Sequence, residues 1–318
     1  MTTPAGARTD GYMDAFRRVF AGPEHRAFYR AGGEGAVLLL HGMVGTPAEM
    51  LPLAEQLHRM GWTVDAPLLP GHGAEIDQLF ETDADAWVTR ARECLDRLRA
   101  THSPVLVVGY SMGGAVALRI LAEVAADRGQ GDCRPCGLVL ISPFIRLPLD
   151  NMWLRLFGPL LQLIVRRMRP FKDVDFDTGP NSEEIRAGIL EFMPGLDIDD
   201  PNVQAEMRRI EVPTRLLGQL DRLGKHARQV AARIGVPTLV LQGSDDEVAR
   251  PAYTRHLLTQ LGGRLTYYEL VAGHDLVQAD APAWSEVEAA VDTFCRQFTD
   301  EAYRLAIARH GCSYREEA

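Results

Sequence analysis

Residues 105–115 read VLVVGYSMGGA, and one serine in this stretch joins a strand pattern to a helix pattern. The apolar run stops at Gly109, and residues 112–125, MGGAVALRILAEVA, repeat apolar side chains at helical spacing. Gly109 to Gly113 fit the pattern G-x-S-x-G, a sharp strand-to-helix turn that strains the serine and exposes its hydroxyl. The positions two before and two after the serine crowd one another, so glycine is expected at both. The stretch therefore predicts a nucleophile elbow with Ser111 at its tip.

The rest of the chain alternates short apolar runs with longer amphipathic stretches. Near-continuous apolar runs indicate parallel strands covered on both faces of a sheet. Their alternation with helices predicts an α/β fold with a mostly parallel, doubly wound sheet. The expected strands are residues 36–42, 62–69, 105–111, 137–143, 237–243 and 265–271, with a further early strand at 25–31. The expected helices are residues 47–60, 82–100, 112–127, 220–234, 251–261 and 283–298.

The alternation breaks between residues 145 and 216, where no clear strand pattern occurs. An insertion between two strands of an open α/β sheet projects from the carboxyl edge, where ligands bind. We therefore expect a helical cap inserted into one large domain. The expected parts are a first core part at 1–144, the cap at 145–216, a second core part at 217–298 and a C-terminal tail at 299–318, for which a helix is one interpretation.

A serine hydroxyl becomes a nucleophile when a base takes its proton, usually a histidine held by a carboxylate. His274 lies in LVAGHDLVQ, just past the last expected strand, and so falls at the same sheet edge as Ser111. For the carboxylate, LVLQGSDDEVARP offers Asp245 and Asp246 at the end of another strand. Asp246 is favoured because it comes three residues after Gly243, which leaves one tight turn to aim it at the edge.

Acyl transfer through Ser111 also needs N–H donors for the developing oxyanion. One is expected from the backbone of Met112, at the amino end of the helix that follows the serine. The other is expected from Met43 in HGMVGTP, residues 41–47, where small residues let the backbone turn towards the site. His41 in the same loop is interpreted as a brace that forms a hydrogen bond.

Composition limits the class of partner. The net charge of −9 over 318 residues argues against nucleic acid, whose phosphates need clustered lysine and arginine. The five cysteines form no disulfide framework, and their odd number favours a reducing compartment. Cys133 and Cys136 form a C-x-x-C without the second pair of a zinc site, so no metal or other cofactor is expected.

Membrane and export signals are not found in the sequence either. No apolar stretch reaches the roughly 18 residues of a transmembrane helix. The first residues lack the continuous apolar run of a secretory signal. These observations predict a cytoplasmic protein that acts on a small molecule. No oligomeric state is predicted.

The combined motifs resemble the α/β-hydrolase superfamily, in which the triad follows the chain order serine, acid, histidine. The motifs are H-G-x-x-G at 41–45, G-x-S-x-G at 109–113, G-x-x-D at 243–246 and G-H-D at 273–275. Within the superfamily, LLLHGMVGTP, LPGHG and GYSMGG are similar to the carboxylesterase and monoacylglycerol-lipase branch, which groups with the serine aminopeptidase type. The resemblance covers residues 25–144 and 217–298.

The resemblance implies a role for each matching position. Epoxide hydrolases and haloalkane dehalogenases of this fold carry aspartate at the position of Ser111, so neither activity is expected. The implied roles are nucleophile for Ser111, acid for Asp246, base for His274, and oxyanion donors for Met43 and Met112.

The substrate is predicted from residues 147–168, which place apolar side chains on several helical faces. One interpretation is an apolar lid over an acyl pocket, which favours an uncharged ester with a medium or long acyl chain. A patch that contacts a lipid interface transiently, and a cap helix that only packs on the core, are the alternatives. Under the first interpretation the substrate-binding residues are Met152, Trp153, Leu156, Phe157 and Leu160.

The sequence thus predicts a serine hydrolase that cleaves carboxylic esters through an acyl-enzyme. A thioesterase, a C–C bond hydrolase, an amidase or urethanase and an aminopeptidase use the same triad and stay open as alternatives. Outside enzymes, the alternative is a catalytically silent ligand-binding protein.

Overall fold

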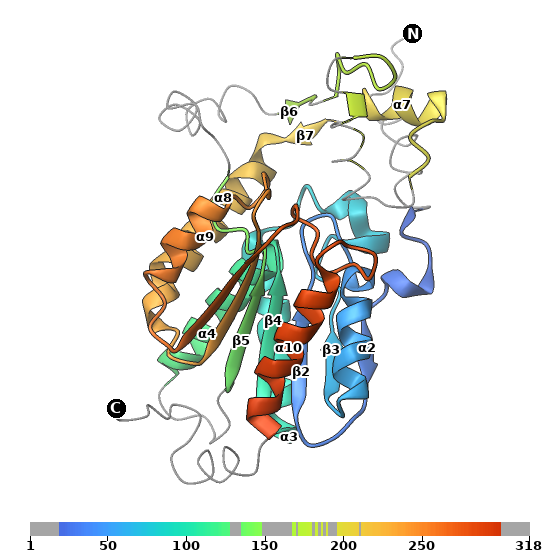
Figure 1. The fold of residues 1–318 in the computed structure, drawn as a ribbon. Helices are drawn as coiled ribbons and strands as arrows, with labels where there is room; N and C mark the ends of the chain where they lie inside the picture. The colour runs from blue at the N-terminus through green and yellow to red at the C-terminus, as the bar shows by residue number, and fades with distance from the viewer. Residues whose placement is uncertain are drawn as a thin grey trace. The chain divides into compact units, whose positions relative to one another are not determined.

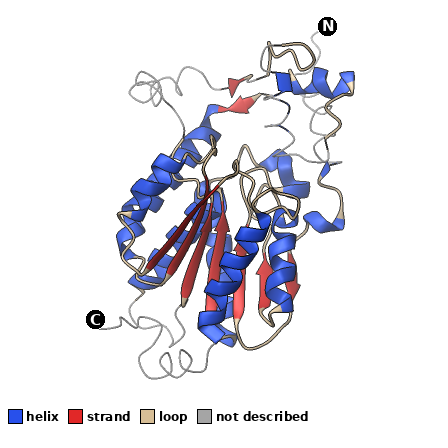
Figure 2. Cartoon of the chain, viewed as in Figure 1, coloured by secondary structure: helices blue, strands red, loops and turns tan. Residues whose placement is uncertain are grey.

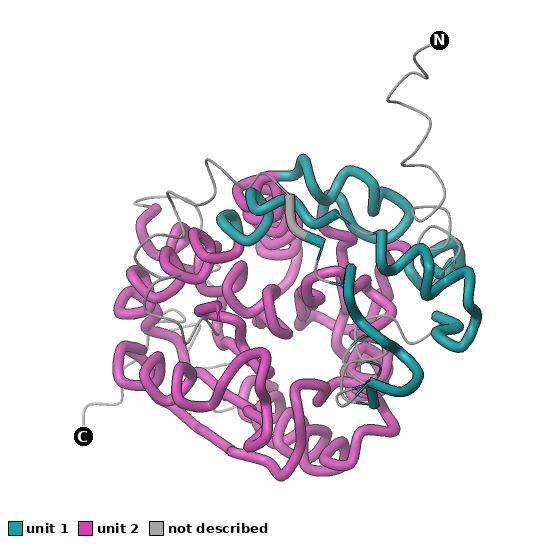
Figure 3. The backbone as a smooth tube through the Cα atoms, turned by 90° about the horizontal axis from the view of Figure 1, so that it is seen from above, with its two compact units in different colours: residues 1–25, 70–82, 149–219 teal, residues 26–69, 83–148, 220–318 magenta. Residues whose placement is uncertain are grey.

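A computed structural model of the protein describes most of the chain, in several segments. They are residues 19–127, 135–147, 167–169, 171–179, 182–183, 186, 189, 196–209 and 211–299. The chain divides into two compact units, which Figure 3 colours separately. The first unit comprises residues 1–25, 70–82 and 149–219, and the second comprises residues 26–69, 83–148 and 220–318. The expected division into a core and a cap at 145–216 stays a prediction.

The second unit is built on a sheet with seven strands among the described residues (Figure 1 and Figure 2). The strand order is β1-β3-β2-β4-β5-β8-β9, in which β1 runs antiparallel to β3 and the other neighbours are parallel. This sheet confirms the expected doubly wound α/β architecture. The strands are β1 (Phe28–Arg30), β2 (Ala36–Leu40), β3 (Thr63–Ala66), β4 (Val105–Tyr110), β5 (Gly137–Ile141), β8 (Thr238–Gly243) and β9 (Leu265–Leu270).

Helices follow the strands where the sequence predicts them. Their apolar residues recur at helical spacing, and in α10 the residues Val287, Val291, Phe294 and Phe298 are all buried. The helices are α2 (Leu51–Arg59), α3 (Ala84–Thr101), α4 (Met112–Ala126), α8 (Thr214–Val230), α9 (Pro251–Leu258) and α10 (Trp284–Thr299). The short 3-10 helices η2 (Pro47–Met50) and η4 (Ala231–Arg233) precede α2 and follow α8.

The core has two layers because side chains alternate between the faces of a strand. Strands β2, β4 and β5 are buried along their whole length, so both faces of the sheet are covered. On one face, Val37 packs in a cluster with Leu53 and Leu57 of α2 and with Val291 and Phe294 of α10. Figure 1 shows α2 and α10 on this face. Helices α3 and α4 contact each other and the sheet, and none of their residues belongs to that cluster.

The first unit contains shorter elements. They are η1 (Pro23–His25), η3 (Gly73–Gln78), β6 (Arg167–Met168), α7 (Pro201–Met207) and β7 (Val212–Pro213). The sequence pattern shows no strand between 145 and 216, yet β6 and β7 pair as a two-residue antiparallel ladder. Two residues are too few to produce an alternating pattern, and one member of the ladder is a proline. Helix α8 also begins at Thr214, before the expected residue 220.

Candidate active site

Three loops at one edge of the sheet carry the predicted triad residues. Ser111 directly follows β4, Asp246 lies in the turn after β8, and His274 lies in the loop after β9. Strands β4, β5, β8 and β9 are neighbours and run parallel, so their carboxyl ends share an edge. The tertiary structure thereby brings together three residues that are far apart in the sequence.

The turn at Ser111 has the strained geometry that the motif predicts. Ser111 has a φ of 50° and a ψ of −118°, a conformation that side-chain-bearing residues rarely adopt. A Cβ on Gly109 would lie 2.4 Å from the carbonyl oxygen of Gly113, and a Cβ on Gly113 would lie 2.2 Å from the carbonyl oxygen of Leu40. The Ser111 N–H donates to the carbonyl of Ile141 over 3.0 Å. Close packing of backbone on backbone therefore holds the turn.

The side chains of the predicted triad lie in hydrogen-bonding distance of each other. His274 Nε2 is 2.9 Å from Ser111 Oγ, and His274 Nδ1 is 2.8 Å from Asp246 Oδ2. All three residues are buried, with exposed fractions of 5% or less, whereas Asp245 is exposed. The ring of Tyr110 packs 5.3 Å from the ring of His274, between centroids. An ionised Asp246 accepts the Nδ1 proton of His274, which leaves Nε2 to accept from the serine hydroxyl.

The surroundings of Asp246 favour its ionised form. Burial by itself would raise the pKa of Asp246, but hydrogen bonds and the charge of His274 outweigh it and hold that pKa below its ordinary value. The backbone N–H groups of Val248 and Ala249 donate to Oδ1 over 2.9 and 2.7 Å. The side-chain amide of Gln242 donates to Oδ2 over 2.9 Å. The sequence analysis does not assign Gln242 to the site, although a polar residue inside the apolar run LVLQG is a signal for such a role.

The loop that carries Met43 is braced as expected by His41. The Leu69 N–H donates to Nε2 of His41 over 3.0 Å, so the ring proton must be on Nδ1. His41 Nδ1 then donates to the carbonyl of Gly42 over 2.9 Å. Within the same loop Val44 has a φ of 63°, an unfavourable value for a β-branched residue. The loop is thus a strained turn that specific hydrogen bonds hold in place.

Of the remaining predicted site residues, the structure describes the oxyanion donor Met112 but not the lid residues. Met112 is the first residue of α4, where backbone N–H groups have no partner within the helix. The predicted lid residues lie outside the residues that the structure describes, so they stay predictions. They are Met152, Trp153, Leu156, Phe157 and Leu160.

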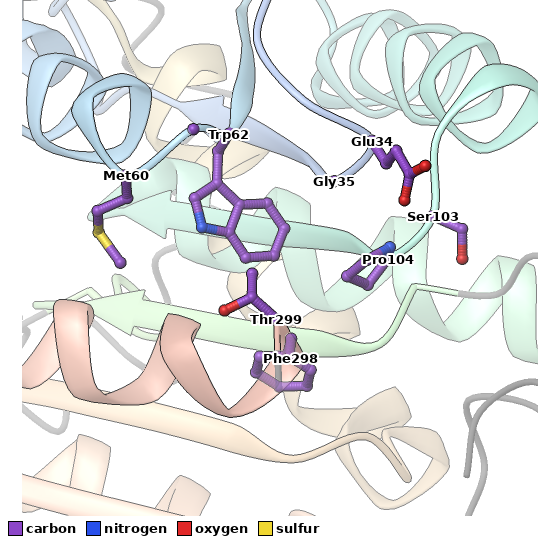
Figure 4. A pocket seen from close by; sticks show the side chains of 9 residues that line it. Glu34, Gly35, Met60, Trp62, Ser103, Pro104, Phe298 and Thr299 are labelled. Carbon is purple, nitrogen blue, oxygen red and sulfur yellow. The ribbon is translucent and has the colours of Figure 1, made fainter. Parts of the chain in front are cut away.

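A cavity lies at the opposite edge of the sheet. It has a volume of about 280 Å³. Its lining includes Glu34, Trp62 and Pro104, which come just before β2, β3 and β4, together with Phe298 and Thr299 at the end of α10 (Figure 4). Because these strands are parallel, residues that precede them lie away from the edge that carries Ser111.

The described residues contain neither a metal-ligand cluster nor a membrane span. Among the described residues, no three His, Cys, Asp or Glu side chains gather as the ligands of a metal ion would. In the same part of the chain, no helix combines the length and apolar character of a membrane span.

Fold and sequence together define the class of this protein as an α/β-hydrolase. A family model described as serine aminopeptidase, S33, matches residues 33–278, and the chain belongs to this family. Its sequence is 30% identical over 224 residues to a thermostable monoacylglycerol lipase of Bacillus sp. (strain H-257), covering 70% of this chain and 75% of that protein.

Two further comparisons agree with this class. A carboxylesterase of Bacillus subtilis (strain 168) is 31% identical over 96 residues, which are 30% of this chain and 39% of that protein. A solved structure from work on LipS and LipT, two metagenome-derived lipolytic enzymes, has a TM-score of 0.63 and 22% identity, covering 86% of this chain and 98% of that one. The structural likeness confirms the predicted fold. The protein is an esterase- or lipase-type α/β-hydrolase, and its activity is that of a carboxylic ester hydrolase.

Proposed function

We propose that this carboxylic ester hydrolase works through an acyl-enzyme formed on Ser111, with His274 as base and Asp246 as acid. The observation that carries the proposal is the pair of contacts at His274, 2.9 Å to Ser111 Oγ and 2.8 Å to Asp246 Oδ2. Nucleophilic attack on an ester requires a serine hydroxyl, an imidazole and a carboxylate in hydrogen-bonding order. Here the hydroxyl lies on a strained turn and the carboxylate is buried.

In the first half of the reaction, Ser111 Oγ attacks the ester carbonyl as its proton passes to His274 Nε2. The imidazolium is stabilised by the ionised carboxylate of Asp246. The tetrahedral intermediate collapses, and His274 gives the proton to the leaving alcohol. In the second half, His274 takes a proton from water, the hydroxide attacks the acyl-enzyme, and the proton returns to Ser111 as the acid leaves.

We propose that two backbone N–H groups, those of Met43 and Met112, donate hydrogen bonds to the oxyanion. The Met112 N–H is at the amino end of α4, where the helix dipole also favours negative charge. The Met43 N–H belongs to the peptide whose carbonyl, that of Gly42, is fixed by His41. Because N–H and C=O point in opposite directions across a trans peptide, fixing one aims the other.

We propose an uncharged ester with a medium or long acyl chain as the substrate. Two observations support this class. Residues 147–168 are rich in apolar side chains, and the relative from Bacillus sp. is named a monoacylglycerol lipase. The alternative within this proposal is that the same apolar region makes transient contact with a lipid interface. We further propose a cytoplasmic protein, since the odd number of cysteines and the free thiols of Cys94 and Cys295 suit a reducing compartment. Cys136 is disulfide-bonded, which corrects the expectation of a chain without disulfides.

Replacing Ser111 tests the nucleophile. Ser111→Ala is expected to lower kcat for p-nitrophenyl esters by about 10⁴-fold or more, with unchanged thermal unfolding. Ser142→Ala is the matched control, because Ser142 is also buried, follows the neighbouring strand β5, and has a positive φ of 42°. It is expected to keep activity. Equal turnover by Ser111→Ala and wild type would overturn the triad.

A substrate screen tests the substrate class. Esters with short to long acyl chains are compared with aminoacyl p-nitroanilides, which an aminopeptidase would cleave. The proposal expects kcat/KM to rise with acyl chain length and the anilides to be poor substrates. A preference for the anilides would instead support the aminopeptidase alternative.

A further inference from the structure

The loop that carries Met43 is held by a second side chain, which the reaction scheme does not use. Glu49 lies in η2, and its Oε2 accepts a hydrogen bond from the Gly42 N–H over 3.0 Å. A Cβ placed on Gly45 would lie 2.1 to 2.2 Å from the carboxylate atoms of Glu49. The carboxylate therefore fills the inside of the turn, and glycine at 45 leaves the room for it.

Gly42 is consequently tied on both sides. Its N–H is held by Glu49 and its carbonyl by His41, with distances of 3.0 and 2.9 Å. The next peptide N–H is that of Met43, the proposed oxyanion donor. Val44 follows with its unfavourable φ of 63°, so a loop without these ties would relax towards a less strained backbone. The two ties explain how the strained turn keeps one orientation.

We propose that Glu49 is the positioning residue of the oxyanion loop, and that a negative charge on its carboxyl group weakens oxyanion binding. This inference rests on the proposed function of Met43. A neutral carboxyl group keeps a carbonyl oxygen that accepts from the Gly42 N–H. An ionised one adds a negative charge beside a loop that must stabilise the negative charge of the oxyanion.

The surroundings of Glu49 favour the neutral form of its carboxyl group. Burial of the carboxyl raises the pKa of Glu49 to about 8, the hydrogen bond from Gly42 acts against this, and the charge of Asp275 adds to it. Asp275 belongs to the loop after β9, beside His274. Burial also raises the pKa of Asp275, and the charges of His274 and Asp280 act on it in opposite directions.

The test compares Glu49→Gln and Glu49→Ala with wild type across pH. The glutamine keeps an acceptor oxygen for Gly42 and has no charge, whereas alanine has neither. At pH 7, Glu49→Gln is expected to stay within about 3-fold of the wild-type kcat. Glu49→Ala is expected to lose about 10-fold or more in kcat, with little change in KM, because an oxyanion donor acts mainly in the transition state.

The pH profile distinguishes a positioning role of Glu49 from a purely structural role. From pH 7 to 9, the wild-type kcat is expected to fall relative to that of Glu49→Gln, as the carboxyl ionises. The matched control is Glu55→Gln, since Glu55 is an exposed carboxylate on α2 whose side chain has 54% of its surface accessible. It is expected to follow the wild-type profile.

Two results would overturn the inference. One is a Glu49→Ala enzyme with wild-type kcat, and the other is a Glu49→Gln enzyme with the same alkaline profile as wild type. Complete labelling of Ser111 by a fluorophosphonate probe in each folded variant keeps this test separate from the proposed function. If wild type itself fails to label, the proposed nucleophile fails, whereas labelled variants with unchanged kinetics reject Glu49 alone.

Discussion

At Asp246, burial and hydrogen bonding act on one carboxyl group in opposite directions. The hydrogen bond and charge of His274, two backbone N–H groups and the amide of Gln242 together outweigh the effect of burial on this carboxylate. The result is a charged group that is 2% exposed and still ionised, as its lowered pKa indicates. The charge orients His274, and the orientation of His274 makes the hydroxyl of Ser111 a nucleophile.

Asp246→Asn tests this orientation directly. The asparagine amide would donate to His274 Nδ1, which would move the ring proton to Nε2 and prevent that nitrogen from accepting the serine proton. A loss of about 10³- to 10⁴-fold in kcat is expected, with a small effect on folding. Asp245→Asn, at the exposed neighbour, is the control and is expected to keep its activity within about 2-fold. Similar losses in both variants would mean that the acid is wrongly assigned.

At the scale of elements, the distance between β2 and the start of α4 decides where the nucleophile stands. Gly113 lies so close to β2 that a Cβ would be 2.2 Å from the carbonyl oxygen of Leu40 and 2.8 Å from that of His41. Both atoms are backbone, so a side chain could be accepted only if the helix or the strand moved. The same movement would shift Ser111 at the end of β4 and the Met43 loop after β2.

Gly113→Ala is therefore expected to cost stability and activity together. A free energy of unfolding lower by about 1–3 kcal/mol, and a kcat reduced by about 10-fold or more, are expected from thermal unfolding and ester kinetics. Gly235→Ala is the matched control, since no atom lies within 4 Å of the Cβ position there. It is expected to leave the melting temperature unchanged or slightly raised. A Gly113→Ala variant as stable and active as the control would contradict the close packing.

At the scale of the whole molecule, partly buried carboxyl groups link stability to pH. The pKa of Glu49 is raised by burial from its ordinary value of 4.5 to about 8. The folded protein therefore binds a proton at Glu49 that the unfolded chain has already lost between these pH values. The contribution of Glu49 to stability is fully present below pH 4.5, and it is lost as the pH rises through about 8.

Thermal unfolding at several pH values checks this sign. Between pH 5 and 9 the wild-type melting temperature is expected to fall by a few °C more than that of Glu49→Gln, which has no proton to lose. Asp275 also has a raised pKa but is present in both proteins, so its contribution cancels in the difference. Parallel curves for the two proteins would show that Glu49 is ionised in the folded state at neutral pH.

Local pattern was sufficient for most of the fold of the second unit. Apolar runs and helical spacing predicted β2 to β5, β8, β9 and the helices between them, because burial on both faces of a sheet demands those patterns. Two features within residues 149–219, which belong to the first unit, were not predictable in this way. The β6–β7 ladder is too short for a period, and the start of α8 at Thr214 is not marked by a change of pattern.

The sequence by itself determined the chemistry at each position: a serine between two glycines, a histidine and an aspartate after strands, and a loop of small residues. Only the tertiary structure decided which groups meet. Gln242 and Glu49 are the examples, because each acts through a contact that no local pattern contains. The physical reason is that patterns record whether a side chain is buried, whereas a hydrogen bond or a shifted pKa depends on which atoms from distant segments surround it.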